Sequence, residues 1–219
     1  QTGPSGNMIT STPVDFDLVG INNISAGTFH TCATLTNQET YCVGQNRSGQ
    51  IGDGFRGEIV YNPYLVSALS SSSIQVASGG NHSCALLTDH SVKCWGSSLE
   101  FLGFGGSTHQ EYPMLVPGLS NVTQVASASY NTCALMIDQT IKCWGWGEYG
   151  QLGDGVSDLY YSTAMPQNVL GINNATQVTG SGYANCALLS TGQVMCWGSR
   201  QYGKLGNGTS SGNEPNPVF

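Results

Sequence analysis

The sequence predicts an all-β repeat protein made of four units of about 50 residues. The main observation is the stretch from Cys133 to Gly145, in which two cysteines stand ten positions apart and a glycine follows the second by two positions. Copies of this stretch begin at Cys32, Cys84 and Cys186, so the first cysteines are separated by 52, 49 and 53 residues. A nearly constant period of this length indicates an array of supersecondary units.

Each copy has the pattern of a β-hairpin, with a polar centre such as Thr88-Asp89-His90-Ser91 between two short apolar runs. Because side chains alternate along a strand, an even separation places both sulfurs on one face, and folding about the midpoint sets them opposite each other. We therefore predict disulfides within the hairpins, pairing Cys32 with Cys42, Cys84 with Cys94, Cys133 with Cys143, and Cys186 with Cys196. Zinc is the weaker alternative, because structural zinc sites need close cysteine pairs that converge on one ion.

Two further strands are predicted in each unit. A proline-led strand precedes each hairpin, at Pro13, Pro63, Pro113 and Pro166, and proline favours an edge strand because it cannot donate a ladder hydrogen bond. An alternating, valine-rich strand such as 74–79 follows it. The expected organisation is an N-terminal arm at 1–12, units at 13–62, 63–112, 113–165 and 166–214, and an extra terminal strand at 215–219.

Glycine-rich turns follow the hairpins at 49–54, 150–155 and 203–208. A phosphate-binding loop is excluded, because neither a Lys-Ser nor a Lys-Thr pair ends these segments and no helix is predicted after them. The glycines are instead expected to permit positive φ and close backbone approach between neighbouring units.

The composition indicates a secreted glycoprotein. Six basic against thirteen acidic residues give a net charge of −7, which argues against nucleic acid as a partner. Paired cysteines, few charges and six N-glycosylation sequons together favour an oxidising, extracellular location and N-linked glycans. No apolar run is long enough for a membrane span. The sequons lie at Asn23, Asn46, Asn81, Asn121, Asn174 and Asn207.

The motifs Cys-Ala-Leu, Cys-Trp-Gly and Gly-Gln-Leu-Gly-Asp-Gly, at this spacing, resemble the regulator-of-chromosome-condensation repeat family over about residues 13–219. The resemblance implies four-stranded blades in a β-propeller, and the cysteine pairs are similar to those of its secreted members. Three features depart from the family pattern. Val43 replaces the tryptophan in the first unit, 100–105 replaces the usual turn in the second, and four units stand where the family usually has seven blades.

The count of proline-led strands suggests how the protein assembles. A fifth such strand, with Pro217, Val218 and Phe219, would compete with the first, formed by Pro13, Val14 and Phe16. Our hypothesis is that the array stays open and that the terminal strand adds to the next molecule, giving head-to-tail filaments. A closed four-bladed ring with a redundant tail and an excerpt of a longer protein are the alternatives.

Catalysis has little support in the sequence, and we expect no enzyme activity, metal or cofactor. His30 and His82 occupy matching places, but Asn131 and Ala184 fill that place in the other units, which favours hydrogen bonding. The acidic residues Asp53 and Asp154 fall in different units, which disfavours paired-carboxylate chemistry. Calcium binding at these turns is a weaker alternative.

The aromatic residues fall into two groups. Trp95, Trp144 and Trp197 recur at one register and are predicted to pack between units. A second group has no repeat pattern and is either a contact surface for a sugar or protein or inter-unit packing. This group comprises Trp146, Tyr149, Tyr160 and Tyr161.

These observations predict a non-enzymatic, secreted glycoprotein that assembles with itself as an extracellular filament or surface-coat subunit. A recognition module that binds another extracellular protein or glycan, lectin-like or inhibitor-like, is the alternative. Guanine-nucleotide exchange, which the resemblance also implies, is disfavoured by the cysteine and sequon pattern.

Overall fold

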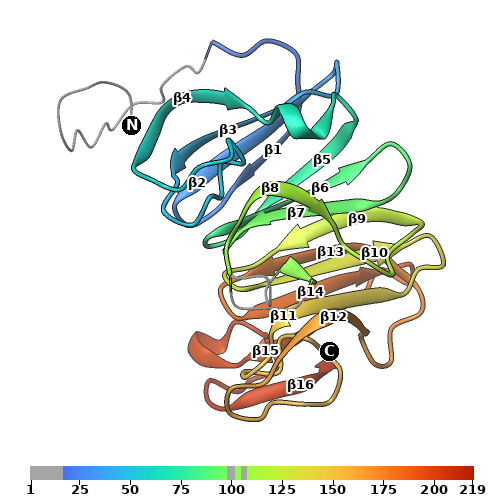
Figure 1. Ribbon diagram of the computed structural model, residues 1–219. Helices are drawn as coiled ribbons and strands as arrows, with labels where there is room; N and C mark the ends of the chain where they lie inside the picture. Colours follow the sequence, from blue (N-terminus) through green and yellow to red (C-terminus); the bar gives the residue numbers. More distant parts are fainter. Residues whose placement is uncertain (1–16, 98–101, 105–107) are drawn as a thin grey trace.

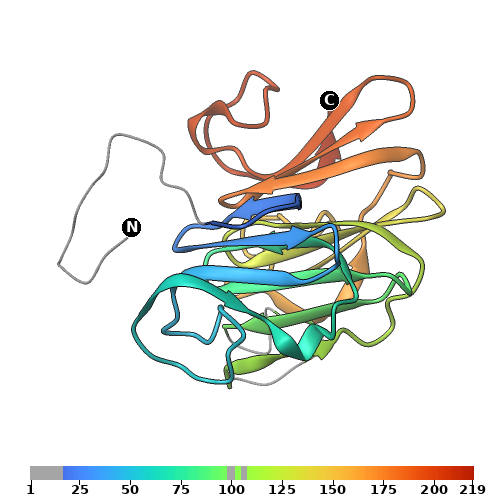
Figure 2. The same ribbon diagram turned by 90° about the horizontal axis from the view of Figure 1, so that it is seen from above.

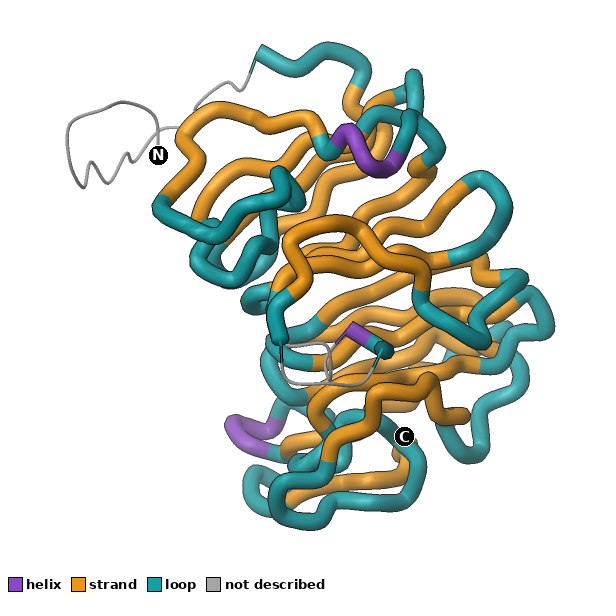
Figure 3. The backbone as a smooth tube through the Cα atoms, in the orientation of Figure 1, coloured by secondary structure: helices purple, strands orange, loops and turns teal. Residues whose placement is uncertain are grey.

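The computed structural model describes residues 17–97, 102–104 and 108–219. Its strands form four antiparallel sheets of four strands each, and every sheet is one blade of an open, partial β-propeller. In Figure 1 the blades follow one another in chain order from the blue end to the red end. Figure 3 shows that strands and loops make up nearly all of the described chain.

The strands have similar lengths in all four blades. Blade 1 contains β1 (Ile21–Ala26), β2 (His30–Leu35), β3 (Thr40–Gln45) and β4 (Ile59–Leu65). Blade 2 contains β5 (Ser73–Ser78), β6 (His82–Leu87), β7 (Val92–Gly96) and β8 (Gln110–Leu115). Blade 3 contains β9 (Val122–Ser127), β10 (Asn131–Met136), β11 (Ile141–Trp146) and β12 (Ser162–Asn168). Blade 4 contains β13 (Ala175–Ser181), β14 (Ala184–Leu189), β15 (Val194–Ser199) and β16 (Asn213–Val218). Two short 3-10 helices, η1 (Ser67–Leu69) and η2 (Gln201–Gly203), lie in the connections.

The first strand of each sheet, β1, β5, β9 or β13, lines the centre of the propeller, where residues from all four blades surround a channel of about 230 Å³. Figure 2 shows the same sheets from above. The hairpins come next in each sheet, and the proline-containing strands β4, β8, β12 and β16 form the outer edge. An outer edge tolerates proline because one side of that strand has no ladder partner.

The expected units assign each proline-led strand to the hairpin that follows it. The structure differs from this assignment. Each one instead completes the preceding blade, so the sheets are offset from the expected units by one strand. The strand with Pro217 and Val218 is therefore no extra strand: it is β16, the ordinary fourth strand of blade 4, with Val218 opposite Cys196. Phe219 follows it and is exposed. Pro13, Val14 and Phe16 lie outside the described residues.

The hairpins carry the four disulfides that their spacing predicts. The paired cysteines lie directly opposite each other in the ladder, as in Cys84 and Cys94, and no cysteine is free. The pairs are Cys32–Cys42, Cys84–Cys94, Cys133–Cys143 and Cys186–Cys196.

The hydrophobic core is divided among the junctions between successive blades. At the first junction Ile51 and the Cys32–Cys42 disulfide of blade 1 pack against Val76 and Trp95 of blade 2. Equivalent clusters fill the junctions between blades 2 and 3 and between blades 3 and 4. The tryptophans predicted to lie between units are fully buried there: Trp95, Trp144 and Trp197.

Candidate interaction surfaces at the two end blades

Each internal junction is built from the glycine-rich turn of one blade and a recess in the next. The turn after β3 enters blade 2, where the carbonyl oxygen of Gln50 accepts hydrogen bonds from Trp95 Nε1 and Ser83 Oγ, both at 2.9 Å. A side chain on Gly52 could not be accommodated, because its Cβ would lie 2.8 Å from Trp95 Nε1 and its φ is +82°. The turn therefore requires glycine to approach the tryptophan this closely.

The junction between blades 3 and 4 repeats this arrangement. The carbonyl oxygen of Gln151 accepts from Trp197 Nε1 at 3.0 Å and from Asn185 Nδ2 at 2.7 Å. Gly153 has a φ of +70°, and a Cβ there would lie 2.9 Å from Trp197 Nε1. The same turn thus meets the same position of the following blade at both junctions.

A second recurring contact joins the inner strands near the channel. A side-chain oxygen on one blade accepts a hydrogen bond from a backbone N–H of the next. Asn23 accepts from Val76 at 2.8 Å, and Gln75 accepts from Val125 at 2.9 Å. Gln124 accepts from Val178 N at 2.8 Å and donates to its carbonyl oxygen at 3.0 Å. These side chains fix each blade against the next.

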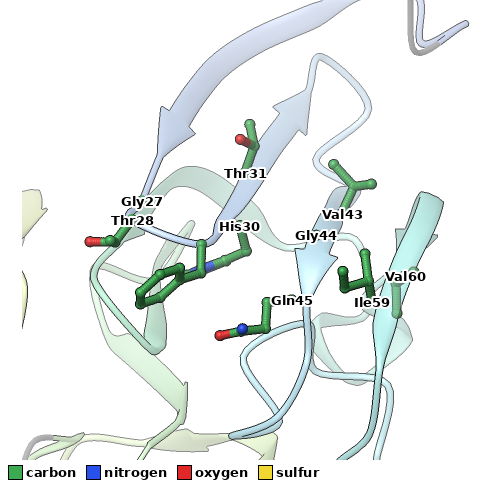
Figure 4. Close-up of a pocket in the computed structure, with 10 residues that line it drawn as sticks. Gly27, Thr28, His30, Thr31, Val43, Gly44, Gln45, Ile59 and Val60 are labelled. Atoms are coloured by element: carbon green, nitrogen blue, oxygen red, sulfur yellow. The ribbon is translucent and has the colours of Figure 1, made fainter. Parts of the chain in front are cut away.

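Blade 1 has the recess of an internal junction, and no turn from the described part of the chain occupies it. A pocket of about 410 Å³ lies at this place and is shown in Figure 4. The channel side of the same face carries Ile24, which is 59% exposed although its counterpart Val76 is only 1% exposed. We call this surface the blade 1 pocket; it is lined by Gly27, Thr28, Phe29, His30, Thr31, Val43, Gly44, Gln45, Ile59 and Val60.

Blade 4 has the opposite half of a junction. Its glycine-rich turn comprises residues 202–208 and is here called the blade 4 turn; within residues 17–97, 102–104 and 108–219 no other blade packs on its glycines. Tyr202 in this turn is 94% exposed, and Gln177, the counterpart of Gln75 and Gln124, is also exposed. Only a small apolar cluster, centred on the Cys186–Cys196 disulfide and Leu205, covers this face.

The two matching histidines form hydrogen bonds between blades, as the sequence predicts. His30 Nε2 lies 2.7 Å from Ser83 Oγ, and His82 Nε2 lies 2.9 Å from Thr132 Oγ1. Because the Ser83 hydroxyl already donates to the Gln50 carbonyl, His30 Nε2 must be the donor of its bond. Burial lowers the pKa of His30 to about 3, with a smaller contribution from His82, and burial lowers the pKa of His82 to about 4.

These pKa values predict that acid weakens the fold. An unfolded histidine titrates near 6.5, so between about pH 6.5 and 3 the unfolded chain binds protons that the folded chain does not, and stability falls as pH falls. A tenfold difference in proton affinity between the folded and the unfolded chain changes the free energy of unfolding by about 1.4 kcal/mol. We expect the double variant His30→Asn/His82→Asn, which copies Asn131, to lose less stability between pH 7 and pH 4. Urea unfolding followed by tryptophan fluorescence measures this, and an equal loss in both proteins would contradict the prediction.

The structure separates the candidate aromatic contact group. Tyr149 lies 4.8 Å from Tyr183 of blade 4, and Trp146 lies 6.4 Å from Tyr130, both between ring centroids. Tyr161 instead donates a 2.5 Å hydrogen bond to Asp154, and burial together with this bond raises its pKa to about 12. Tyr160 is 78% exposed.

The turn carboxylates have structural partners within their own turns. Asp53 accepts hydrogen bonds from Asn46 Nδ2 at 2.9 Å and from Phe55 N at 3.0 Å, and Asp154 accepts from Val156 N at 3.2 Å and from Tyr161. Among the described residues no group of three or more His, Cys, Asp or Glu side chains could hold a metal ion. The same part of the chain contains no helix that could cross a membrane.

The sequons differ in accessibility. Asn46 is 2% exposed and its Nδ2, the atom that a glycan would occupy, donates to Asp53 and to the carbonyl oxygen of Phe55. A glycan at this atom is incompatible with the folded turn, so Asn46 has a structural role that the sequon pattern concealed. Asn121 is exposed, and four others are partly exposed: Asn23, Asn81, Asn174 and Asn207.

The four sheets and their repeated junctions define a β-propeller repeat protein. The Regulator of chromosome condensation (RCC1) repeat matches residues 21–50, 74–100, 122–151 and 175–204, and a second form of this repeat matches 38–86 and 143–188. The chain therefore belongs to the RCC1 repeat family.

Similar proteins are larger than this chain. Human E3 ubiquitin-protein ligase HERC2 is 30% identical over 201 residues, which are 89% of this chain and 4% of the ligase. The Ultraviolet-B receptor UVR8 of Arabidopsis thaliana is 27% identical over 215 residues, or 95% of this chain and 48% of the receptor.

Solved structures show the same fold. The crystal structure of human WBSCR16 has a TM-score of 0.81 and 24% identity, covering 92% of this chain and 53% of that one. Yeast RCC1 (Prp20), in its crystal structure bound to Kap60, has a TM-score of 0.73 and 23% identity. The match covers 90% of this chain and 48% of that one. The chain thus spans about half the length of these propellers.

Proposed function

We propose that this protein is a non-enzymatic, extracellular structural glycoprotein that associates with itself head to tail through its two end blades. The proposal rests on the exposed faces of blade 1 and blade 4. These two faces are complementary halves of the junction that joins successive blades within the chain. Blade 4 presents the turn and blade 1 presents the recess. A head-to-tail contact that does not close on itself produces a filament.

The location is inferred from the disulfides. All eight cysteines are paired in four hairpins, and disulfides persist in oxidising compartments such as the cell exterior. The sequons on exposed or partly exposed asparagines fit a glycan coat that keeps a protein with only 9% charged residues in solution.

The route of assembly differs from donation of the C-terminal strand, because β16 is already paired with β15. Stacking of blade faces requires no strand to leave its sheet. It would bury Ile24 of one copy on the face of another, in the way that Val76, Val125 and Val178 are buried within the chain.

The test is the mass and shape of the native, non-reduced chain over a range of concentrations, by light scattering and negative-stain microscopy. We expect dimers and longer linear oligomers that increase with concentration. Ile24→Asp places a charge at the centre of the proposed contact and should leave a monomer. Ile137→Asp, at a hairpin turn where the residue is 65% exposed, is the control and should assemble normally. A wild-type chain that stays monomeric at every concentration would refute the proposal.

A further inference from the structure

We infer that the partner of the blade 1 pocket is the blade 4 turn of a second copy of this chain, with Tyr202 of one copy packed on Phe29 of the other. This inference rests on the proposed self-association and identifies the contact that produces it. It requires no rearrangement of either blade, because both surfaces are exposed.

The internal junction between blades 3 and 4 supplies the geometry. Tyr149 immediately precedes the third glycine-rich turn, and its ring lies 4.8 Å from that of Tyr183, which immediately precedes β14 of the next blade. Tyr202 immediately precedes Gly203 of the blade 4 turn, as Tyr149 immediately precedes Gly150, and Phe29 immediately precedes β2. If a second copy docks on blade 1 in the way that blade 3 packs on blade 4, Tyr202 of that copy lies against Phe29.

The strand register supports this equivalence. His30 pairs with Gly44 in blade 1, and Ala184 pairs with Gly198 in blade 4. Phe29 and Tyr183 thus occupy the same place at the rim of their recesses. Both aromatic side chains of the proposed pair are exposed in the single chain, Tyr202 at 94% and Phe29 at 50%. Such a pair, which loses its exposure on docking, is the kind of contact that dominates an interface.

Polar groups on the two faces are also matched. Thr31 lies opposite Val43, as Ser83 lies opposite Trp95, so its hydroxyl is placed to donate to the carbonyl oxygen of Lys204, the counterpart of Gln50. Exposed Gln177 is placed to accept from the backbone N–H of Ile24 in the other copy, as Gln124 accepts from Val178. Docking would thus supply partners for groups whose counterparts are paired at the internal junctions of blades 1 and 2 and of blades 3 and 4.

One difference makes the contact between copies weaker than the internal ones. Val43 stands where the other blades have tryptophan, so the indole N–H that donates to the turn carbonyl is missing from the blade 1 pocket. The smaller side chain also leaves room in the pocket. We therefore expect a reversible association that depends on concentration, whereas the internal junctions persist as long as the chain is folded.

Cross-linking tests the contact directly. Phe29→Cys and Tyr202→Cys are prepared as separate proteins, mixed, and treated with a short bis-maleimide. The mixture should give a cross-linked dimer, and each variant alone should not, because the two positions meet only across copies. The control mixture combines Tyr202→Cys with Ile137→Cys, which lies on the hairpin turn of blade 3 and should give only background cross-linking.

A charge at the contact gives a second, independent measurement. Tyr202→Asp should weaken self-association about tenfold or more, the loss typical of a removed aromatic anchor. Leu159→Asp is the control, since Leu159 is 69% exposed but lies in the connection between β11 and β12 of blade 3, and it should leave the association unchanged. Circular dichroism should show that both variants are folded.

The outcomes separate the two proposals. Self-association of the wild-type chain, with no cross-link between positions 29 and 202 and no effect of Tyr202→Asp, would overturn this contact and leave the proposed function intact. A wild-type chain that does not associate at all would overturn both, and would assign the pocket to further blades of a longer chain or to a different protein.

Discussion

Replacement of Trp95 with alanine is expected to lower the free energy of unfolding by about 3–5 kcal/mol, the range measured when a buried large aromatic residue is truncated. Trp95 is fully buried between blades 1 and 2, and its Nε1 donates to the carbonyl oxygen of Gln50 at 2.9 Å. The variant loses the apolar contacts of the indole and also leaves that buried carbonyl with only the Ser83 hydroxyl as a donor. Urea unfolding monitored by circular dichroism measures the change.

Ile137→Ala is the control for this variant, because Ile137 is 65% exposed and the change should alter stability by less than about 0.5 kcal/mol. A loss below about 1 kcal/mol for Trp95→Ala would show that the junction is not packed as described. Trp197→Ala should behave like Trp95→Ala, since Trp197 makes the same contact with Gln151.

Removal of the disulfides should have the largest cumulative effect. Cross-linking two residues ten apart restricts the unfolded chain enough to contribute about 3 kcal/mol, so four such links contribute roughly 12 kcal/mol, comparable with the whole stability of a typical domain. We expect the fully reduced chain to be unfolded near body temperature. The double variant Cys84→Ser/Cys94→Ser should lose about 3 kcal/mol. Thermal unfolding with and without a reducing agent measures both effects.

The order of reduction provides a check on the open face of blade 4. Cys186 is half-buried, whereas both cysteines of the pairs in blades 2 and 3 are fully buried by the next blade. Because thiol–disulfide exchange requires access to a sulfur, the Cys186–Cys196 bond should be reduced first under native conditions. Alkylation of partly reduced protein followed by peptide mass spectrometry identifies the first pair to open. Equal rates at all four bonds would contradict this arrangement, and an unchanged melting temperature after complete reduction would contradict the expected stabilisation.

The hairpins and their disulfides could be predicted from the sequence because all the residues that decide them are local. The spacing of Cys133 and Cys143 sets both the strand register and the sulfur geometry within one ribbon. The position of the proline-led strands could not be predicted this way. From Pro63, the next predicted strand at 74–79 is nearer in sequence than the previous hairpin, yet β4 pairs with that earlier hairpin. The longer connection exists because its turn must reach into blade 2 before the chain returns to blade 1.

The candidate surface was only partly predictable for a related reason. The sequence led to the hypothesis that a free terminal strand drives assembly, but that strand is β16, which is paired with β15 within blade 4. The contact between Gln50 and Trp95 joins residues 45 positions apart, and nothing local in either segment indicates the other. One signal was available in the sequence. A tyrosine stands directly before the first glycine of two of the turns, Tyr149 before Gly150 and Tyr202 before Gly203.

The confinement of every disulfide to one hairpin has a consequence for how the protein is made. Ribosomes add about 5–20 residues per second, so both cysteines of a hairpin emerge within a few seconds of each other and before the next pair is synthesised. The correct partner of each newly made cysteine is therefore also the nearest cysteine in the chain. The 105 pairings that are possible for eight cysteines need not compete. Oxidation can proceed stepwise with synthesis, one ribbon at a time, without a rearrangement of wrong bonds at the end.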